Sequence, residues 1–315
     1  MMTDSNGFGA KLKEQTVCVR LSISRCGESR SFSREQNEIT AEQFNAKVSR
    51  VKGRRQVVDS RNEKWSAVKS MLTVVDKYFK SRTVAIPGED GRRLLRKSFV
   101  SEFDETMGTL HGQLQSAKEE LRLAEHEIRE ASRQDLADLW DDNLLPPNMA
   151  DEFDFSWAYV EEAVPNYMAE LHPELFKREQ ERIAALFDVA AQEATRQLTE
   201  ELHKLIASMV ERLTTSPGEK AKTFRSSLVG NLTEFFDKFK LLNVGNSAEL
   251  EAAVEQCKAT LTADGQQLTA EKLRKDVQVR QAVASDMSAL AEKLSTMVVE
   301  RPKRRVRFTE KKEVE

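Results

Sequence analysis

The clearest hydrophobic pattern in the chain is a heptad seam between Phe103 and Ala131. Its apolar positions recur at alternating spacings of four and three residues over about four heptads: Phe103, Met107, Leu110, Leu114, Ala117, Leu121, Ala124, Ile128 and Ala131. This spacing places the apolar side chains along one face of a helix. The segment is therefore predicted to be a long, coiled-coil-like helix that ends before Pro146 and Pro147.

Other segments also have helical spacing. Apolar residues recur at intervals of three and four in residues 65–79 and 174–213, which is typical of long amphipathic helices. The first helix is expected over about residues 40–80, with Gly53 as a candidate interruption. The loop at residues 87–91 contains glycines and a proline, and we expect the next helix to begin near Arg92. Shorter helices are predicted at residues 220–242, 247–261 and 269–299, followed by a charged tail, residues 301–315, that is expected to be disordered.

Two short segments alternate between apolar and polar residues, which indicates half-buried strands. They are residues 17–23 and the aromatic residues 153–159, and residues 30–32 could form a return strand after a turn. A two-stranded ribbon is only marginally stable alone. We predict that residues 17–23 and 153–159 pair in a small sheet that locks the register of the long helices, because heptad seams specify register poorly.

The predicted fold class is mainly α. It consists of a long antiparallel, coiled-coil-like helical stalk with a small β cap and a C-terminal helical bundle. The predicted divisions are an N-terminal arm and β ribbon, the stalk with its strand insert, a C-terminal helical subdomain and the tail: residues 1–39, 40–215, 216–300 and 301–315.

Composition agrees with long solvated helices. Of the 315 residues, 39% are hydrophobic and 32% are charged, with 12 glycines and 7 prolines. No run of 18 apolar residues exists, and the first ten residues lack the apolar core of a signal peptide. We therefore expect a cytoplasmic protein without a membrane partner, whose three cysteines, Cys18, Cys26 and Cys257, are reduced.

The charge is distributed in blocks. Residues 1–100 carry a net charge of +10, residues 101–172 of −14, and residues 173–315 of +1. Opposite blocks on one chain can pair within the fold, or each can present a surface to a partner. The sequence leaves both readings open.

Basic residues form three clusters. Five of them, with Arg61, would share about four turns of the predicted helix at residues 40–80, four follow the loop at residues 87–91, and five lie in residues 301–307 of the tail. Such clusters contact phosphates, although few aromatic residues are interleaved for stacking on single strands. The candidate contacts for nucleic acid or an acidic partner are Lys47, Arg50, Lys52, Arg54, Arg55, Arg92, Arg93, Arg96, Lys97, Arg301, Lys303, Arg304, Arg305 and Arg307.

No set of residues predicts a reaction. The four histidines lack a recognised ligand spacing, and the loop at residues 87–93 lacks the glycine and lysine pattern of a phosphate cradle. Acidic residues gather in residues 135–154, where Mg²⁺ or Ca²⁺ could bind, but without EF-hand spacing a solvated or protein-docking surface is the preferred interpretation. The sequence therefore predicts no catalytic residue, no cofactor and no metal site.

Several motifs occur in a fixed order along the chain. They are L-S-I-S-R-C-G-E-S-R at residues 21–30, L-P-P with a following F-D-F at residues 145–155, and K-T-F-R-S-S-L-V-G-N-L at residues 222–232 with a following L-N-V at residues 242–244. With these motifs the chain resembles a family of bacteriophage and bacterial proteins of uncharacterised function. The resemblance implies a phage or mobile-element origin and, in many genomes, a neighbouring MoxR-like AAA+ ATPase and a von Willebrand factor A-type partner. It supplies no functional residues.

The expected function is that of a non-enzymatic interaction or adaptor protein, with an AAA+ ATPase or self-association as the expected partner. The alternative is a phage nucleic-acid-binding accessory protein that uses the basic N-terminal third and the tail.

Overall fold

The computed structural model describes residues 14–88, 91–161, 167–214, 227–263 and 266–298. It is mainly helical with a small antiparallel sheet, which confirms the fold class at this level. The chain divides into two compact units. The first unit is residues 13–183, the second is residues 1–12 with 184–315, and each is described by itself.

The sheet of the first unit has four strands in the order β4-β5-β1-β6. Its strands are β1 (Thr16–Ser24), β4 (Val84–Ala85), β5 (Arg92–Arg96) and β6 (Asp154–Val160). Strand β1 is antiparallel to both β5 and β6, so the segment nearest the N-terminus occupies an interior position in the sheet.

The pairing of β1 with β6 was predicted from the sequence and is confirmed. Leu21 lies opposite Trp157 and Ile23 lies opposite Phe155, across more than 120 residues of sequence. The second neighbour of β1, strand β5, was not predicted.

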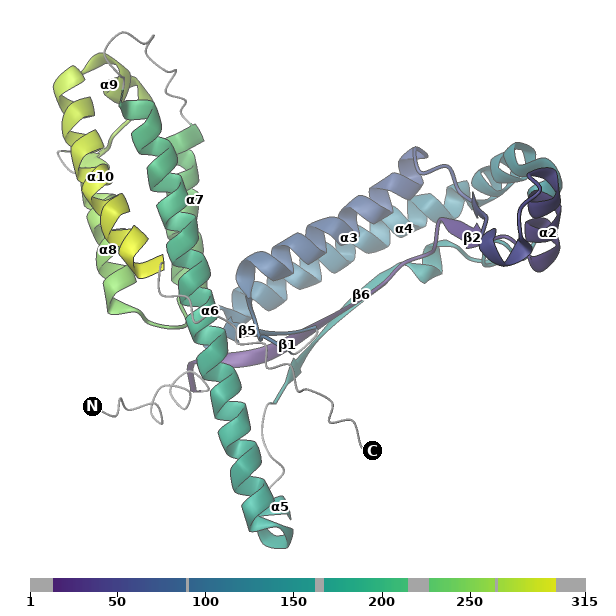
Figure 1. Ribbon diagram of the computed structural model, residues 1–315, viewed down its shortest axis with the longest axis horizontal. Helices are drawn as coiled ribbons and strands as arrows, with labels where there is room; N and C mark the ends of the chain where they lie inside the picture. The colour runs from purple at the N-terminus through teal and green to yellow at the C-terminus, as the bar shows by residue number, and fades with distance from the viewer. Residues whose placement is uncertain (1–13, 89–90, 162–166, 215–226, 264–265, 299–315) are drawn as a thin grey trace, which may run out of the picture. The chain divides into compact units, whose positions relative to one another are not determined.

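Two antiparallel helices pack against the sheet in the first unit (Figure 1). They are α3 (Glu63–Arg82) and α4 (Val100–Leu136). Ion pairs show their direction, because Lys64 at the start of α3 lies 2.7 Å from Glu120 while Arg82 at its end lies 3.7 Å from Glu102. At 1.5 Å per residue α3 is about 30 Å long and α4 about 55 Å.

Polar side chains join α4 to β6. The Asp104 carboxylate accepts hydrogen bonds from Trp157 Nε1 at 2.8 Å and from Tyr159 Oη at 3.0 Å. Burial and the Asp104 carboxylate raise the pKa of Tyr159 to about 12. The phenol therefore stays protonated and keeps donating at neutral pH, so β6 is fixed to a defined position along α4.

The predicted seam of α4 forms most of the buried face of this helix. The buried residues of α4 are Phe103, Met107, Leu110, Leu114, Lys118, Leu121, Ile128 and Ser132, with Ala117 and Ala124 partly buried. The seam departs from the heptad at its end, where Ala131 is exposed and Ser132 is buried. The Ser132 hydroxyl is satisfied there by the Ile128 carbonyl at 2.8 Å.

The prediction of one helix over residues 40–80 was wrong. The apolar set Trp65, Val68, Leu72, Val75 and Phe79 is buried as expected, but it belongs to the shorter α3. The preceding residues form β2 (Ser29–Ser31), α2 (Arg34–Gln43), the 3-10 turn η1 (Val48–Arg50) and β3 (Arg54–Gln56). Strands β2 and β3 pair with each other, so the return strand expected near residue 30 exists but does not pair with β1.

The prediction that a helix begins near Arg92 was also wrong, because strand β5 begins there. Gly88 and Gly91 both have positive φ, at 83° and 79°, in the connection between β4 and β5. Leu94 and Leu95 of β5 lie on opposite faces of the sheet and are both buried. A strand buried on both faces has no apolar and polar alternation, so the usual strand signal is missing. Helix α4 begins only after the turn η2 (Lys97–Phe99).

Shorter elements complete the first unit. They are η3 (Ala137–Leu139), η4 (Ala150–Glu152) and α5 (Tyr167–Leu171). Helix α6 (Pro173–Leu213) begins in the first unit and continues into the second, and its bounds agree closely with the predicted helix.

The second unit is built from α6 and the helices that follow it. They are α7 (Ser227–Leu242), α8 (Ala248–Thr260), α9 (Ala270–Lys275) and α10 (Val277–Val298), with the small strand pair β7 (Thr262–Ala263) and β8 (Gln266–Gln267). One cluster of buried apolar residues includes Leu202, Phe235, Val254 and Leu290. The helix predicted at residues 269–299 is broken at Asp276, whose carboxylate caps α10 by accepting from the backbone N–H groups of Gln278 and Val279.

We predict a position-dependent cost for shortening leucines of α4. Leu114 and Leu121 have no exposed surface, so replacing either with Ala should lower the free energy of unfolding by about 2–5 kcal/mol. Leu123 is 81% exposed in the same helix, and Leu123→Ala should change it by less than about 0.5 kcal/mol. Denaturant titration of the three variants measures this, and equal small effects would mean that the seam is not buried.

Candidate functional site

The first basic cluster lies in one continuous segment at the end of the first unit. We call residues 44–56 the basic segment, since it holds five Lys and Arg residues and no Asp or Glu. It includes η1 and β3 rather than one helix, so the predicted placement of these residues on about four helical turns is corrected. The basic segment does not continue the preceding helix, because capping interactions define both ends of α2.

A capping box starts α2 and a left-handed turn ends it. Gln36 N–H donates to the Ser33 hydroxyl, and the Gln36 side chain accepts from the Ser33 N–H. At the other end Asn45 has a φ of 50°, and Ala46 N–H donates to the Ala41 carbonyl at 2.8 Å. The chain therefore leaves the helix at Phe44, whose side chain is 71% exposed.

A second set of contacts returns the basic segment to the start of α2. Asn37 Oδ1 accepts from Gly53 N–H at 2.8 Å, and Phe32 N–H donates to the Gly53 carbonyl at 2.9 Å. The Phe32 ring lies so close that a Cβ on Gly53 would be 2.1 Å from its Cδ2. Any side chain at position 53 would therefore force the Phe32 ring to shift.

The arginines of β3 serve this local structure. Arg55 Nη1 donates to Gln36 Oε1 at 2.5 Å and its guanidinium lies 5.9 Å from the Phe32 ring centroid. Arg54 Nη2 donates to Ser29 Oγ at 2.8 Å. In contrast, three side chains of the segment are exposed and form no hydrogen bond or ion pair within the part of the chain that the structure describes: Lys47, Arg50 and Lys52.

Glu28 attaches this region to α3. Its Oε1 accepts from Trp65 Nε1 at 2.6 Å and from Lys69 Nζ at 2.5 Å. Burial raises the pKa of Glu28, but the two hydrogen bonds and the charge of Lys69 outweigh burial, so the pKa is lowered overall. The carboxylate thus stays ionised, and the basic segment is fixed to the N-terminal end of α3.

The second predicted cluster lies at the opposite end of α3, about 30 Å away by helical rise. Arg93 Nη2 donates to the Thr83 carbonyl at 2.7 Å, and Arg93 Nε donates to Thr83 Oγ1 at 2.7 Å. Burial lowers the pKa of Arg93, which acts as a cap for the last turn of α3. Arg92 and Arg96 are half-buried, and Lys97 is exposed. The two clusters therefore do not form one surface.

An acidic turn lies beside the basic segment. We give this name to residues 134–143, which contain four aspartates and no Lys or Arg. A surface hollow of about 330 Å³ is lined by Gln56 and Arg61 on one side and by Asp135 and Leu136 on the other. Both charged segments can be recognised in the sequence, but their proximity cannot. They lie close together because α3 and α4 are antiparallel.

The carboxylates of the acidic turn differ in their contacts. Asp142 accepts from Arg133 at 2.7 Å and from Trp140 Nε1 at 2.9 Å, which lowers its pKa. Asp59, and to a smaller extent Asp135, raise the pKa of Arg61. Asp138 is exposed and has no hydrogen-bond or ion-pair partner among the described residues. The turn thus keeps exposed negative charge.

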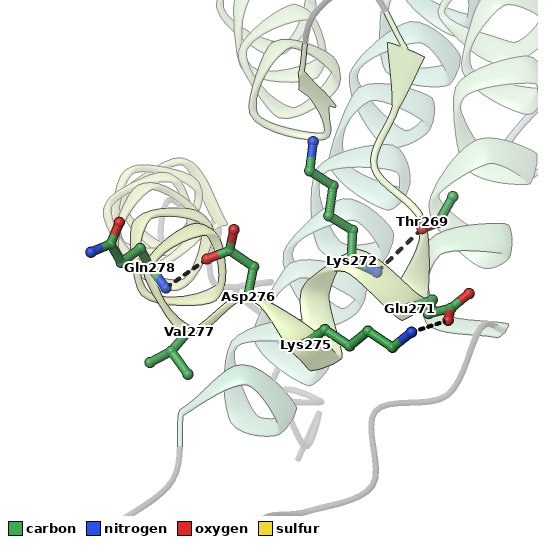
Figure 2. Close-up of a pocket in the computed structure, with 7 residues that line it drawn as sticks. All are labelled: Thr269, Glu271, Lys272, Lys275, Asp276, Val277 and Gln278. Carbon is green, nitrogen blue, oxygen red and sulfur yellow. Dashed lines mark hydrogen bonds and ion pairs between the residues drawn. The ribbon is translucent and has the colours of Figure 1, made fainter.

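The second unit has a hollow of about 550 Å³ at the junction of α9 and α10, shown in Figure 2. Four of its polar side chains make local contacts. Lys275 Nζ lies 2.6 Å from Glu271 Oε1, Thr269 Oγ1 accepts from Lys272 N–H at 3.3 Å, and Asp276 caps α10. These groups do not converge on the hollow, so they define no reaction centre there.

Other candidate chemistry receives no support from the described residues. Among them, no three His, Cys, Asp or Glu side chains are placed to hold a metal ion. Cys18, Cys26 and Cys257 are buried and form no disulfide among the described residues, and burial raises the pKa of Cys257 to about 12. None of the described helices is long and apolar enough to cross a membrane. The tail candidates lie outside the described residues: Arg301, Lys303, Arg304, Arg305 and Arg307.

No protein-family model matches this chain, and neither does any curated protein or solved structure. The resemblance to a phage family therefore stays an expectation.

We predict that Gly53→Ala disrupts the basic segment. The added methyl group would overlap the Phe32 ring, and the displacement should lower the free energy of unfolding by about 1–3 kcal/mol. Gly112→Ala is the matched control, because it adds the same methyl group in the interior of α4 with no atom within 4 Å, and it should raise stability by about 1 kcal/mol. Denaturant titration measures both, and a Gly53→Ala variant as stable as Gly112→Ala would contradict the close packing of Phe32.

Proposed function

We propose that this chain is a non-enzymatic interaction protein, an adaptor that presents charged surfaces from a helical scaffold. One observation carries the proposal. Lys47, Arg50 and Lys52 are exposed on the same short segment as the exposed Phe44, and capping bonds and the close packing of Gly53 hold this segment in place. A preorganised surface loses little conformational entropy on binding, which favours recognition of a partner.

The scaffold that we propose has a coiled-coil-like stalk, a β cap and a C-terminal helical bundle. The buried seam of α4 against α3 supports the stalk, and the four-stranded sheet of the first unit is the candidate cap. The apolar cluster shared by α6, α7, α8 and α10 supports the bundle. In this proposal the helices supply rigidity and the charged segments supply contacts.

The partner in this proposal is another protein, either an AAA+ ATPase or a second copy of the chain. The proposal of an AAA+ ATPase as the partner rests on the family resemblance alone. On the same resemblance we propose that the protein is phage-encoded and acts in the host cytoplasm.

The second candidate function is that of a phage nucleic-acid-binding accessory protein. The observation that favours it is the same basic segment, whose five cations have no carboxylate among them. Exposed cations bind phosphates through counterion release. The segment offers one exposed aromatic ring, Phe44, whereas binding of single strands uses several stacking rings. The interaction protein is therefore the preferred proposal.

A charge-reversal variant tests both candidates. Lys47→Glu with Lys52→Glu reverses two exposed charges of the basic segment, and Lys77→Glu with Lys177→Glu is the control with the same change in net charge. We expect the first variant alone to lose protein partners that the wild type captures, as measured by affinity capture with mass spectrometry. Labelled single-stranded and duplex oligonucleotides should bind both variants equally across a salt series. Loss of oligonucleotide binding in the first variant alone would favour the second candidate, and no difference in either measurement would refute both.

A further inference from the structure

The end of the first unit presents two surfaces of opposite charge side by side. Gln56 of the basic segment and Asp135 of the acidic turn line the same hollow. In Figure 1 the end of α4 lies near α2, at the end of the first unit that is remote from β5. The two surfaces thus occupy one end of one compact unit.

These charges are only partly neutralised within the fold. Lys64 with Glu120 and Arg82 with Glu102 join the basic and acidic blocks, but they lie along α3 and α4 rather than at this end. Lys47, Lys52 and Asp138 have no ion pair among the residues that the structure describes. Separate positive and negative surfaces therefore remain beside each other.

Adjacent surfaces of opposite charge are complementary to themselves. When two copies of a chain are related by a two-fold axis, the basic surface of each copy can meet the acidic surface of the other. The same contact then forms twice. Electrostatic complementarity of this kind fixes the orientation of the two copies and increases the rate of association.

We propose that the basic segment of one copy docks on the acidic turn of a second copy, and reciprocally, in a two-fold symmetric dimer. This dimer rests on the proposed interaction function, with a second copy of the chain as the partner of the basic segment. Apolar side chains accompany the charges on both surfaces, with Phe44 at 71% exposure and Val48 at 42% on one and Leu139 at 38% on the other. Contact between the copies would bury this apolar area together with the ion pairs.

The same arrangement disfavours nucleic acid as the occupant. A phosphate backbone that followed the basic segment to Gln56 would approach Asp135, which lines the same hollow, and like charges repel. A second copy instead brings cations to the carboxylates of the acidic turn. The acidic turn is thus part of the binding surface for a second copy, whereas it is an obstacle for nucleic acid.

Charge swapping in the full chain tests the proposal. The first variant carries Lys47→Glu and Lys52→Glu, the second carries Asp135→Lys and Asp138→Lys, and the control carries Lys77→Glu and Lys177→Glu. All six positions are exposed, so folding should be kept, which circular dichroism checks. Sedimentation equilibrium in about 0.05 M to about 0.5 M NaCl measures the dimer dissociation constant.

We expect the wild type and the control to dimerise at low salt and to dissociate as salt is raised. Each of the two swapped variants should weaken its own dimer by at least about 100-fold. An equimolar mixture of these two variants should dimerise again, because the introduced glutamates of one variant then face the introduced lysines of the other, while the two unchanged surfaces attract each other as in the wild type. This rescue separates docking from a mere loss of folding.

Three results would overturn the dimer: a wild type that is monomeric across the salt range, swapped variants that dimerise like the wild type, or a mixture that stays monomeric. If the chain is monomeric but the first variant still loses captured proteins, the dimer is wrong and the proposed function stands. If the first variant instead loses only oligonucleotide binding, the basic segment is a nucleic-acid contact and both proposals on it fail.

Discussion

The pairing of β1 with β6 is the constraint on which the first unit depends. Strand β1 has few local partners, and its hydrogen bonds go to strands that precede and follow α4 in the sequence. Because β5 enters α4 through η2 and β6 follows the return from its far end, their common neighbour β1 connects the two flanks of this helix. Asp104, bonded to Trp157 and Tyr159, then fixes where β6 lies along α4. A heptad seam alone would tolerate a slip of seven residues, whereas these specific bonds do not.

The sequence predicted the elements whose periodicity is strong. The seam of α4, the buried face of α3 and the partnership of two distant strands all follow from apolar residues at regular spacing. Strand β5 was missed because Leu94 and Leu95 are both buried and give no alternation. The 40–80 region was misread because its stop signal, Asn45 in a left-handed conformation, contains neither glycine nor proline. The division of the chain into four parts at residues 39, 215 and 300 stays a prediction.

The candidate site was predictable as composition but not as geometry. Clusters of Lys and Arg can be read directly from the sequence, yet Arg93 caps α3 and Arg55 lies against Phe32, so these two cations stabilise the fold. Lys47, Arg50 and Lys52 differ because they form no ion pair with any carboxylate that the structure describes. The proximity of the acidic turn depends on the antiparallel course of α3 and α4, which is a tertiary property that no local pattern encodes. Charge patterns thus identified the surfaces, and packing decided which residues remain available.

Amide hydrogen exchange after a single substitution in β1 tests the central role of this strand most directly. Ser22 is exposed and pairs with Ser156 of β6, while the pairs with β5 involve residues 16–20. Ser22→Pro removes a donor and hinders pairing, whereas Ser22→Ala keeps the backbone N–H. We predict that Ser22→Pro accelerates amide exchange in Asp154–Val160 by at least about 100-fold, whereas exchange in Arg92–Arg96 stays much slower than in Asp154–Val160. Ser22→Ala should exchange at the same rates as the wild type in both strands. Unchanged exchange in Asp154–Val160 of the proline variant would contradict the claim that the first unit depends on the pairing of β1 with β6.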